Sequence, residues 1–107
     1  MQYRKFGATE LLVSEVGFGA WAIGGGAMVG TTAIGWGNAE DEVSEKAIYA
    51  SLDAGINFFD TADIYGVGHS EELLGKIIGG RKDVIIASKA VMFPGIMSLP
   101  LITVVSI

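Results

Sequence analysis

The sequence predicts an α/β fold, because two helical patterns alternate with short apolar runs along the chain. The runs "INFFD" and "DVIIASK" lack the alternation of a strand with one exposed face, which favours a parallel sheet covered on both faces. With 107 residues, half of them hydrophobic, the chain has the size and apolar content of one domain.

The N-terminal elements are a predicted hairpin and a brief strand. The segments "QYRKF" and "LLVSEV" flank the turn-like "GATE", and "EVGFGAWAIGGG" indicates a strand followed by a loop. The next stretch, "GGGAMVGTTAIGWGN", is rich in Gly and Thr. Glycine tolerates unusual backbone angles and a close approach of a ligand, so this stretch is either a ligand-binding loop or a flexible surface connection.

The first predicted helix runs from Glu40 to Ala54, with negative charge in its first turn and Gly55 at its end. Its apolar residues recur at helical spacing and define the face expected to pack on the sheet: Val43, Ala47, Ala50 and Ala54.

The second predicted helix is capped by Ser70 and stopped by Gly79 and Gly80. Its inner face is expected to carry four apolar residues: Leu73, Leu74, Ile77 and Ile78.

Composition excludes several classes of function. The net charge is −5 and no Lys/Arg cluster could follow a phosphate backbone, so a nucleic acid is not an expected partner. The lack of Cys excludes thiolate metal sites and Cys nucleophiles and fits a reducing compartment. The N-terminus lacks the apolar core of a secretory signal, and we expect a cytoplasmic protein.

Residues 90–107, "AVMFPGIMSLPLITVVSI", carry no charged side chain. A segment of this length could cross a membrane, but Pro94, Gly95 and Pro100 interrupt it and no basic flank follows. No membrane association is therefore expected, and "LITVVSI" is predicted to be a buried strand or a disordered end.

Three polar residues fall where predicted strands finish: Asp60 after "INFF", Tyr65 in the loop beyond it, and Lys89 after "VIIAS". In a (β/α) barrel the C-terminal strand ends open on one face, where active sites are built, so these residues can converge. A Lys beside a Tyr stabilises the phenolate form of the Tyr, and an Asp beside that Lys keeps the ammonium group in place. A Tyr in such surroundings can protonate a carbonyl oxygen. Each residue taken alone has a simpler explanation: Asp60 as a turn former, Tyr65 as a packing residue and Lys89 as a solvated side chain. Their shared position favours the catalytic interpretation.

Two further residues border this predicted site. Trp21 follows the first strand and would form a wall of a small-molecule pocket, although packing alone also explains a Trp. His69, the only histidine, either touches a substrate or simply begins the second helix. With no Cys and no second His, no metal site is expected.

Three motifs together resemble a known family. "VSEVGFGAWAIGGG", "DAGINFFDTADIYGVGHSEELLGKII" and "DVIIASK" are similar to the amino-terminal third of an aldo-keto reductase, over Met1 to about Lys89. The middle motif is specific, because it fixes an Asp, a Tyr and a Glu-x-x-Leu-Gly helix start at set spacings. The resemblance implies a (β/α)8 TIM barrel, closed at its bottom by the N-terminal hairpin, that reduces aldehydes or ketones with NADPH.

The resemblance also implies roles for single residues. Asp60, Tyr65 and Lys89 match three members of the family's catalytic tetrad. Tyr65 would be the general acid, Lys89 would favour its ionisation, and a buried Asp60 would pair with Lys89. The backbone around Ala20 and Trp21, together with Asp60, would border the nicotinamide and the carbonyl substrate.

The chain also departs from the family pattern. The fourth catalytic residue, a His on the strand after the Lys, has no counterpart, and the far half of the barrel, which grips the cofactor's phosphate and adenine, is missing. We therefore expect a truncated or frame-shifted copy, with a partial barrel over residues 1–89 and an apolar tail, unlike the family, over residues 90–107. Exposed sheet edges should make it prone to aggregation or self-association, with little reductase activity.

Two alternatives to an enzyme stay open. Some aldo-keto reductase folds serve as non-catalytic auxiliary subunits of potassium channels. A small βαβ module could instead bind a partner chain that completes its sheet.

Overall fold

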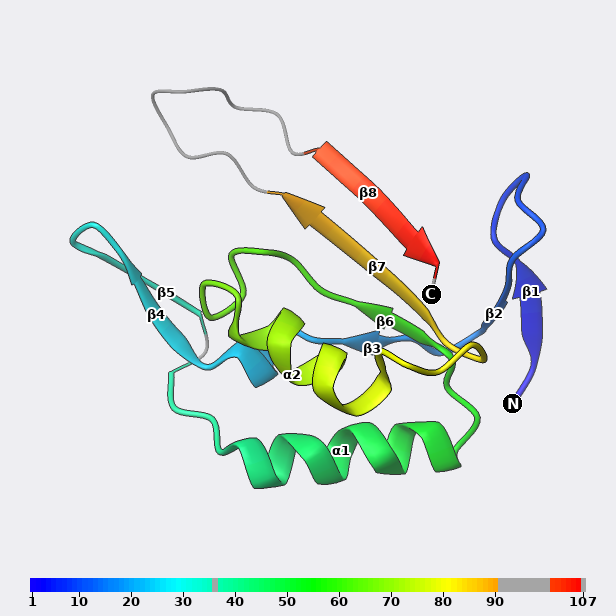
Figure 1. Ribbon diagram of the computed structural model, residues 1–107, viewed down its shortest axis with the longest axis horizontal. Helices are drawn as coiled ribbons and strands as arrows, with labels where there is room; N and C mark the ends of the chain where they lie inside the picture. The colour runs from blue at the N-terminus through cyan, green and yellow to red at the C-terminus, as the bar shows by residue number, and fades with distance from the viewer. Residues whose placement is uncertain (36, 91–100, 107) are drawn as a thin grey trace.

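The computed structural model describes residues 1–35, 37–90 and 101–106, and Figure 1 shows how their helices and strands are arranged. In chain order the elements are β1 (Tyr3–Lys5), β2 (Leu12–Ser14), β3 (Phe18–Gly19), the 3-10 helix η1 (Ala22–Gly24), β4 (Gly26–Val29), β5 (Thr32–Gly35), α1 (Asp41–Asp53), β6 (Phe58–Asp60), α2 (His69–Ile78), β7 (Ile85–Ala90) and β8 (Leu101–Ser106).

The central sheet has the strand order β3-β6-β7-β8. Strands β3, β6 and β7 are parallel, with Phe18 opposite Phe59 and Phe59 opposite Ile86. Helix α1 lies between β3 and β6 in the chain, and α2 lies between β6 and β7, which is the crossover that parallel neighbours require. The predicted α/β order is confirmed.

Strand β8 joins this sheet in the opposite direction. It pairs with β7 in antiparallel register, with Ile85 opposite Ser106 and Ala90 opposite Leu101. The segment "LITVVSI", for which a buried strand or a disordered end is predicted, forms a strand over residues 101–106, and the burial of that strand stays a prediction. An antiparallel neighbour departs from the all-parallel order of a (β/α)8 barrel.

The core lies between the sheet and the two helices. Side chains alternate between the faces of a strand, so Phe59 and Ile86 share the face that meets Ile48 of α1 and Leu74 and Ile78 of α2. Each of these five is at most 8% exposed. Full burial of one such side chain contributes roughly 1.5–3 kcal/mol. The prediction for the inner face of α2 is confirmed, since its apolar residues are buried or partly buried in this cluster: Leu73, Leu74, Ile77 and Ile78.

Helix α1 lies within the predicted range, with Glu40 and Ala54 as its two caps, and Gly55 comes after the C-cap with a φ of 92°, but the helix buries a different face. Ser44 and Ile48 are its buried residues. The residues predicted to face the core are exposed: Val43, Ala47, Ala50 and Ala54. The prediction was wrong because Ile48 buries far more apolar surface than an alanine, so the sheet selects the helix face that carries it.

The start of α2 also differs from the prediction. Gly68 is its N-cap and Ser70 lies inside the first turn, so Ser70 does not cap the helix. The Ser70 side chain is fully buried and makes its hydrogen bonds to other parts of the chain. Helix α2 ends at Ile78, just before Gly79, as predicted.

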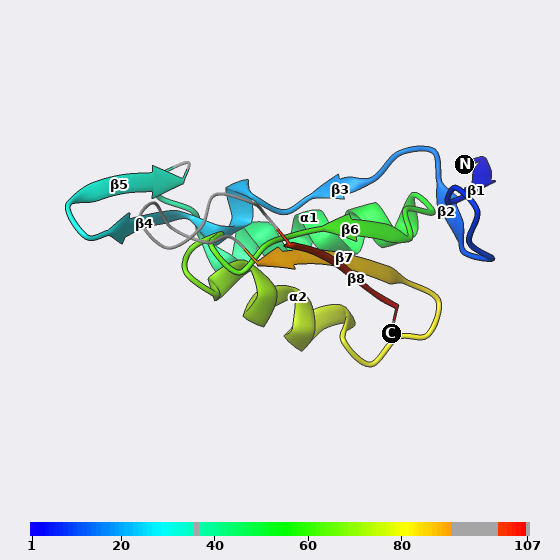
Figure 2. The same cartoon turned by 90° about the horizontal axis from the view of Figure 1, so that it is seen from above.

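Two hairpins lie at opposite ends of the molecule in both views (Figures 1 and 2). The predicted N-terminal hairpin, β1 with β2, is anchored where β6 begins, because Asn57 accepts a hydrogen bond from Ser14 N at 2.7 Å and donates one to Leu12 O at 2.9 Å. The Gly/Thr-rich stretch, predicted to be a loop, forms the second hairpin, β4 with β5. It projects from the end at which β6 and β7 finish (Figure 1).

Among the residues that the structure describes, none of the helices is long and apolar enough to cross a membrane. Pro94, Gly95 and Pro100, which argue against a span in the sequence, lie outside the described residues. The domain boundary between residues 89 and 90 stays a prediction, and β7 runs across it to Ala90.

Candidate active site

The register of the parallel strands brings Asp60 and Lys89 to one face of the sheet. Asp60 is the last residue of β6 and lies opposite Ala87 of β7. Lys89 is two residues beyond Ala87. Every second side chain of a strand lies on the same face of the sheet, so the side chains of Lys89 and Asp60 share one face. Ser88, the residue between Ala87 and Lys89, lies on the opposite face, toward the helices, and donates a hydrogen bond to Glu71 of α2.

The Lys89 ammonium group connects the ends of two strands. It donates hydrogen bonds to Asp60 Oδ2 and to the Thr61 carbonyl oxygen, both at 3.2 Å. It also lies 4.9 Å from the centroid of the Tyr65 ring. Burial lowers the pKa of Lys89, but hydrogen bonds to Tyr65 and Asp60 outweigh burial and leave this pKa raised above its ordinary value of 10.5. Lys89 is therefore a fixed positive charge at neutral pH.

Asp60 is less buried than the sequence predicts. Its side chain is 50% exposed, against 24% for Lys89. The prediction of a buried acid was wrong because Asp60 is the last residue of β6, where one side of the carboxylate faces Lys89 and the other remains open. The charged partner that the sequence argument required is present.

Tyr65 and Trp21 stand next to each other although they come from different loops. Their rings are stacked, with centroids 6.0 Å apart and planes inclined by 27°. Trp21 is 46% exposed, so one of its surfaces stays open to solvent. The site therefore combines an aromatic wall with a positive charge and a carboxylate.

A close approach of two backbones holds the Tyr65 loop in place. A Cβ atom added to Gly24 would lie 2.7 Å from the Tyr65 carbonyl carbon, and one added to Gly66 would overlap the Gly24 carbonyl oxygen. Gly66 also has a φ of 65°, which side chains rarely adopt. Both glycines are required by this contact, which joins η1 to the residues that follow β6.

Two buried hydroxyl groups, which the sequence analysis did not place in the site, lie beneath it. Thr61 Oγ1 and Ser70 Oγ are 2.7 Å apart, and Ser70 Oγ donates to the Ala20 carbonyl oxygen at 2.8 Å. The signal in the sequence was a Thr and a Ser that flank the Tyr65 loop. Ser70 was instead assigned to a local capping role.

His69 begins α2, in agreement with the simpler of its two predicted roles. Its Nε2 lies 2.6 Å from Asp41 Oδ1, so the pair joins the first residues of the two helices. In the part of the chain that the structure describes, no three His, Cys, Asp or Glu side chains are grouped to hold a metal ion.

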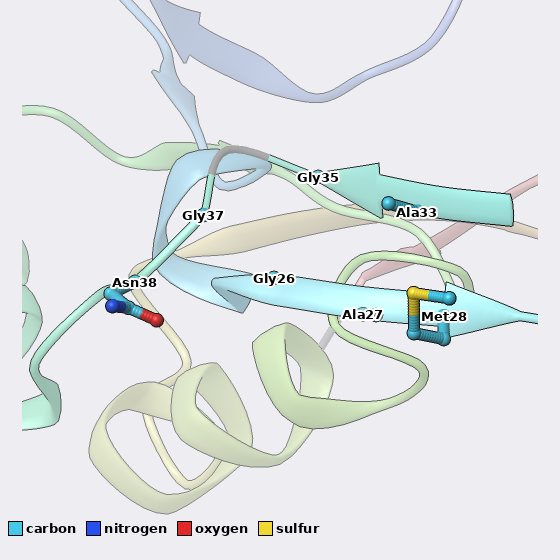
Figure 3. Close-up of a pocket in the computed structure, with 7 residues that line it drawn as sticks. All are labelled: Gly26, Ala27, Met28, Ala33, Gly35, Gly37 and Asn38. Atoms are coloured by element: carbon cyan, nitrogen blue, oxygen red, sulfur yellow. The ribbon is translucent and has the colours of Figure 1, made fainter.

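A hollow of about 400 Å³ lies at the β4–β5 hairpin, outside the candidate site. Figure 3 shows that Met28 and Ala33 of the β4–β5 hairpin lie toward one end of it and Asn38, on the way to α1, toward the other. Its lining residues come from the hairpin and the segment after it, and include none of Asp60, Tyr65 and Lys89. The candidate site is defined by its arrangement of charge and aromatic rings, and not by this hollow.

Comparison with known proteins places the chain in a family. A sequence profile described as "Aldo/keto reductase family" matches residues 15–100. The aldo-keto reductase YhdN of Bacillus subtilis is 40% identical over 95 residues, which are 86% of this chain and 26% of that protein. A "Probable voltage-gated potassium channel subunit beta" of Oryza sativa subsp. japonica is 35% identical over 94 residues, covering 83% of this chain and 25% of that protein.

A solved structure shows the same likeness. The glycerol dehydrogenase of Gluconobacter oxydans superposes with a TM-score of 0.66 at 30% identity, over 97% of this chain and 30% of that one. The chain thus spans about a quarter of the length of the curated relatives it matches. Its parallel βα units correspond to part of an aldo-keto reductase barrel. The chain belongs to the aldo/keto reductase family.

Proposed function

We propose that the protein serves the NADPH-dependent reduction of aldehydes or ketones to alcohols. The observation that carries this proposal is the position of the Lys89 ammonium, which is 3.2 Å from Asp60 Oδ2 and 4.9 Å from the centre of the Tyr65 ring. A tyrosine next to a fixed positive charge is suited to give a proton to a carbonyl oxygen, because the charge stabilises the phenolate that remains.

Each of the three residues has a distinct part in this proposal. Tyr65 donates its phenolic proton to the substrate oxygen as the carbonyl carbon is reduced. Lys89 stabilises the negative charge that develops on the Tyr65 oxygen. Asp60 holds the Lys89 ammonium at the strand end, which keeps the charge aligned on the phenol.

NADPH is the proposed cofactor, and it would supply the hydride for this reduction. Trp21 supports this proposal, because the exposed part of its ring offers an aromatic surface beside Tyr65 for the nicotinamide. We assign Ala20, Trp21 and Asp60 to the border of the nicotinamide and the carbonyl substrate. Ala20 is fully buried, so only its backbone would take part.

A chimera tests the proposal. Residues 1–89 of this chain replace the matching segment of the Bacillus subtilis relative, and NADPH oxidation is followed with 4-nitrobenzaldehyde as substrate. We expect steady, aldehyde-dependent oxidation of NADPH, because the three residues would meet the remainder of a barrel. A chimera that folds and binds NADPH but does not oxidise it would contradict the proposal. The 107-residue chain alone is expected to show little turnover and to self-associate.

A role as a channel subunit is the second candidate, favoured by the 35% identity to the rice protein described as a potassium channel subunit. That role needs cofactor binding and assembly with other subunits rather than turnover. NADPH binding without oxidation, in a defined tetramer on size-exclusion chromatography, would favour it over the reductase.

A further inference from the structure

The structure contains a hydroxyl relay, formed by Thr61 and Ser70, beneath the candidate site. The two side-chain oxygens are 2.7 Å apart, and Ser70 Oγ lies 2.8 Å from the Ala20 carbonyl oxygen. A hydroxyl has one proton to donate and a carbonyl oxygen can only accept. Ser70 must therefore donate to Ala20, and Thr61 must donate to Ser70, so the relay has a defined direction.

One end of the relay fixes the residue before Trp21. The Ala20 carbonyl accepts from Ser70, and the Ala20 N–H donates to the Asp60 carbonyl oxygen at 2.8 Å. Ala20 is thus held on one side by the first turn of α2 and on the other by the end of β6. The backbone that leads into Trp21 has little freedom to move while both bonds are present.

The other end of the relay fixes the contact that holds Lys89. The Thr61 N–H donates to the Ala87 carbonyl oxygen at 2.8 Å, and the Thr61 carbonyl accepts from Lys89 Nζ at 3.2 Å. Its side chain is bound by Ser70. Thr61 is therefore bound through its amide, its carbonyl and its hydroxyl.

Local helix capping does not account for these hydrogen bonds. Gly68 is the N-cap of α2, and the Ser70 hydroxyl serves a carbonyl group 50 positions away in the sequence. Ala20 and Ser70 are 0% exposed and Thr61 is 1% exposed. A polar group this deeply buried is costly when a partner is lost, so removal of either hydroxyl must disturb the segments that it joins.

We propose that Thr61 and Ser70 are positioning residues, whose hydroxyl relay fixes Trp21 and Lys89 relative to each other for carbonyl reduction. The proposal rests on the proposed function, since it assigns the relay to the same site. Neither hydroxyl is offered as a catalytic group, because both are closed off from solvent.

Hydrogen exchange of the full 107-residue chain, read by mass spectrometry, tests the relay without any cofactor. Thr61→Val keeps the shape of the side chain and removes its hydroxyl, whereas Thr61→Ser keeps the hydroxyl. Ser51→Ala is the matched control, because it removes a hydroxyl that bonds a backbone carbonyl within α1.

We expect Thr61→Val to accelerate exchange of the Ala20 and Thr61 amides by roughly tenfold or more, with β1 and β2 unchanged. Thr61→Ser and Ser51→Ala should exchange like the unaltered chain in these segments. Ser70→Ala should cause a larger local loss than Thr61→Val, because it leaves both the Ala20 carbonyl and the Thr61 hydroxyl without a partner. If Ser70→Ala does not fold, the comparison of Thr61→Val with Thr61→Ser still tests whether the relay fixes these segments.

Two results would overturn the proposal at this stage. Exchange in Thr61→Val that equals that of the unaltered chain would show that the relay fixes nothing. Acceleration that is equal in every segment would show a merely structural role.

The chimera supplies the functional readout. We expect Thr61→Val to lower kcat for 4-nitrobenzaldehyde roughly tenfold, whereas Thr61→Ser should keep kcat close to that of the unsubstituted chimera. A small displacement of the reacting groups lowers the rate even when the protein still folds. Unchanged kcat and KM in an active Thr61→Val chimera would overturn the proposal. If the unsubstituted chimera does not oxidise NADPH, the proposed function has failed, and the exchange results still decide whether the relay fixes Trp21 and Lys89.

Discussion

Lys89 Nζ lies 3.2 Å from Asp60 Oδ2, across the ends of two adjacent parallel strands. The pairing depends on register, because a shift of β7 by one residue would turn the Lys89 side chain to the opposite face of the sheet. In this register, a short apolar strand that ends in Asp60 and a neighbouring strand that carries Lys89 just before its last residue bring the two charges together.

The Lys89 pair predicts a pH dependence of stability. The pKa of Lys89 is raised in the folded chain, so its contribution is complete below the ordinary value of 10.5 and is lost as pH rises through the higher folded value. The free energy of unfolding, from urea titrations, should therefore fall more steeply above pH 10.5 in the unaltered chain than in Lys89→Met. Lys46→Met, which removes an exposed lysine of α1, is the control and should follow the unaltered chain. Parallel curves for the unaltered chain and Lys89→Met would contradict the assignment.

The contact between Gly24 and Gly66 predicts a large effect of a single methyl group. Gly66→Ala should lower the free energy of unfolding by about 2 kcal/mol or more, because the new Cβ meets the Gly24 carbonyl and the residue must keep a positive φ. Gly75→Ala is the matched control, since its Cβ would meet no heavy atom within 4 Å outside its own helix. That change should stabilise the chain by up to about 1 kcal/mol through helix propensity. Urea unfolding gives both values, and equal stability of the two variants would refute the close contact.

The anchor of the N-terminal hairpin predicts a third effect. Asn57→Ala removes the hydrogen bonds to Ser14 and Leu12 and should cost about 1–3 kcal/mol. The thermal midpoint should fall by about 4–8 °C for each kcal/mol lost. Asn38→Ala, at an exposed position before α1, should leave the midpoint nearly unchanged. A midpoint in Asn57→Ala that matches the control would mean that the hairpin is held by other contacts.

Sequence patterns predict the strands β6 and β7 and the helices α1 and α2, because each of these elements has a local cause. The apolar runs around Phe59 and Ile86 indicate buried strands, and the first-turn acids and following Gly55 delimit α1. The site residues Asp60 and Lys89 could also be placed together, because parallel strands finish at the same edge of a sheet.

The remaining features depend on contacts between distant residues. The buried face of α1 was assigned to Val43 and three alanines at the correct period, but Ile48 determines which face is buried. Ser70 has the local pattern of a cap, whereas its partner Ala20 lies 50 positions away. The Gly/Thr-rich stretch forms a hairpin through the pairing of β4 with β5, and glycines alone do not fix such a register.

The most direct test of the proposed function is the rate of carbonyl reduction in the chimera when Tyr65 is changed to Phe. The phenylalanine keeps the ring that stacks on Trp21 and loses only the phenolic proton. We predict that kcat for 4-nitrobenzaldehyde falls by about 10²-fold or more while NADPH still binds, and that Tyr49→Phe, an exposed tyrosine of α1, has no effect. A Tyr65→Phe chimera with unchanged kcat would contradict the proposal that this tyrosine, beside Lys89 and Asp60, is the proton donor.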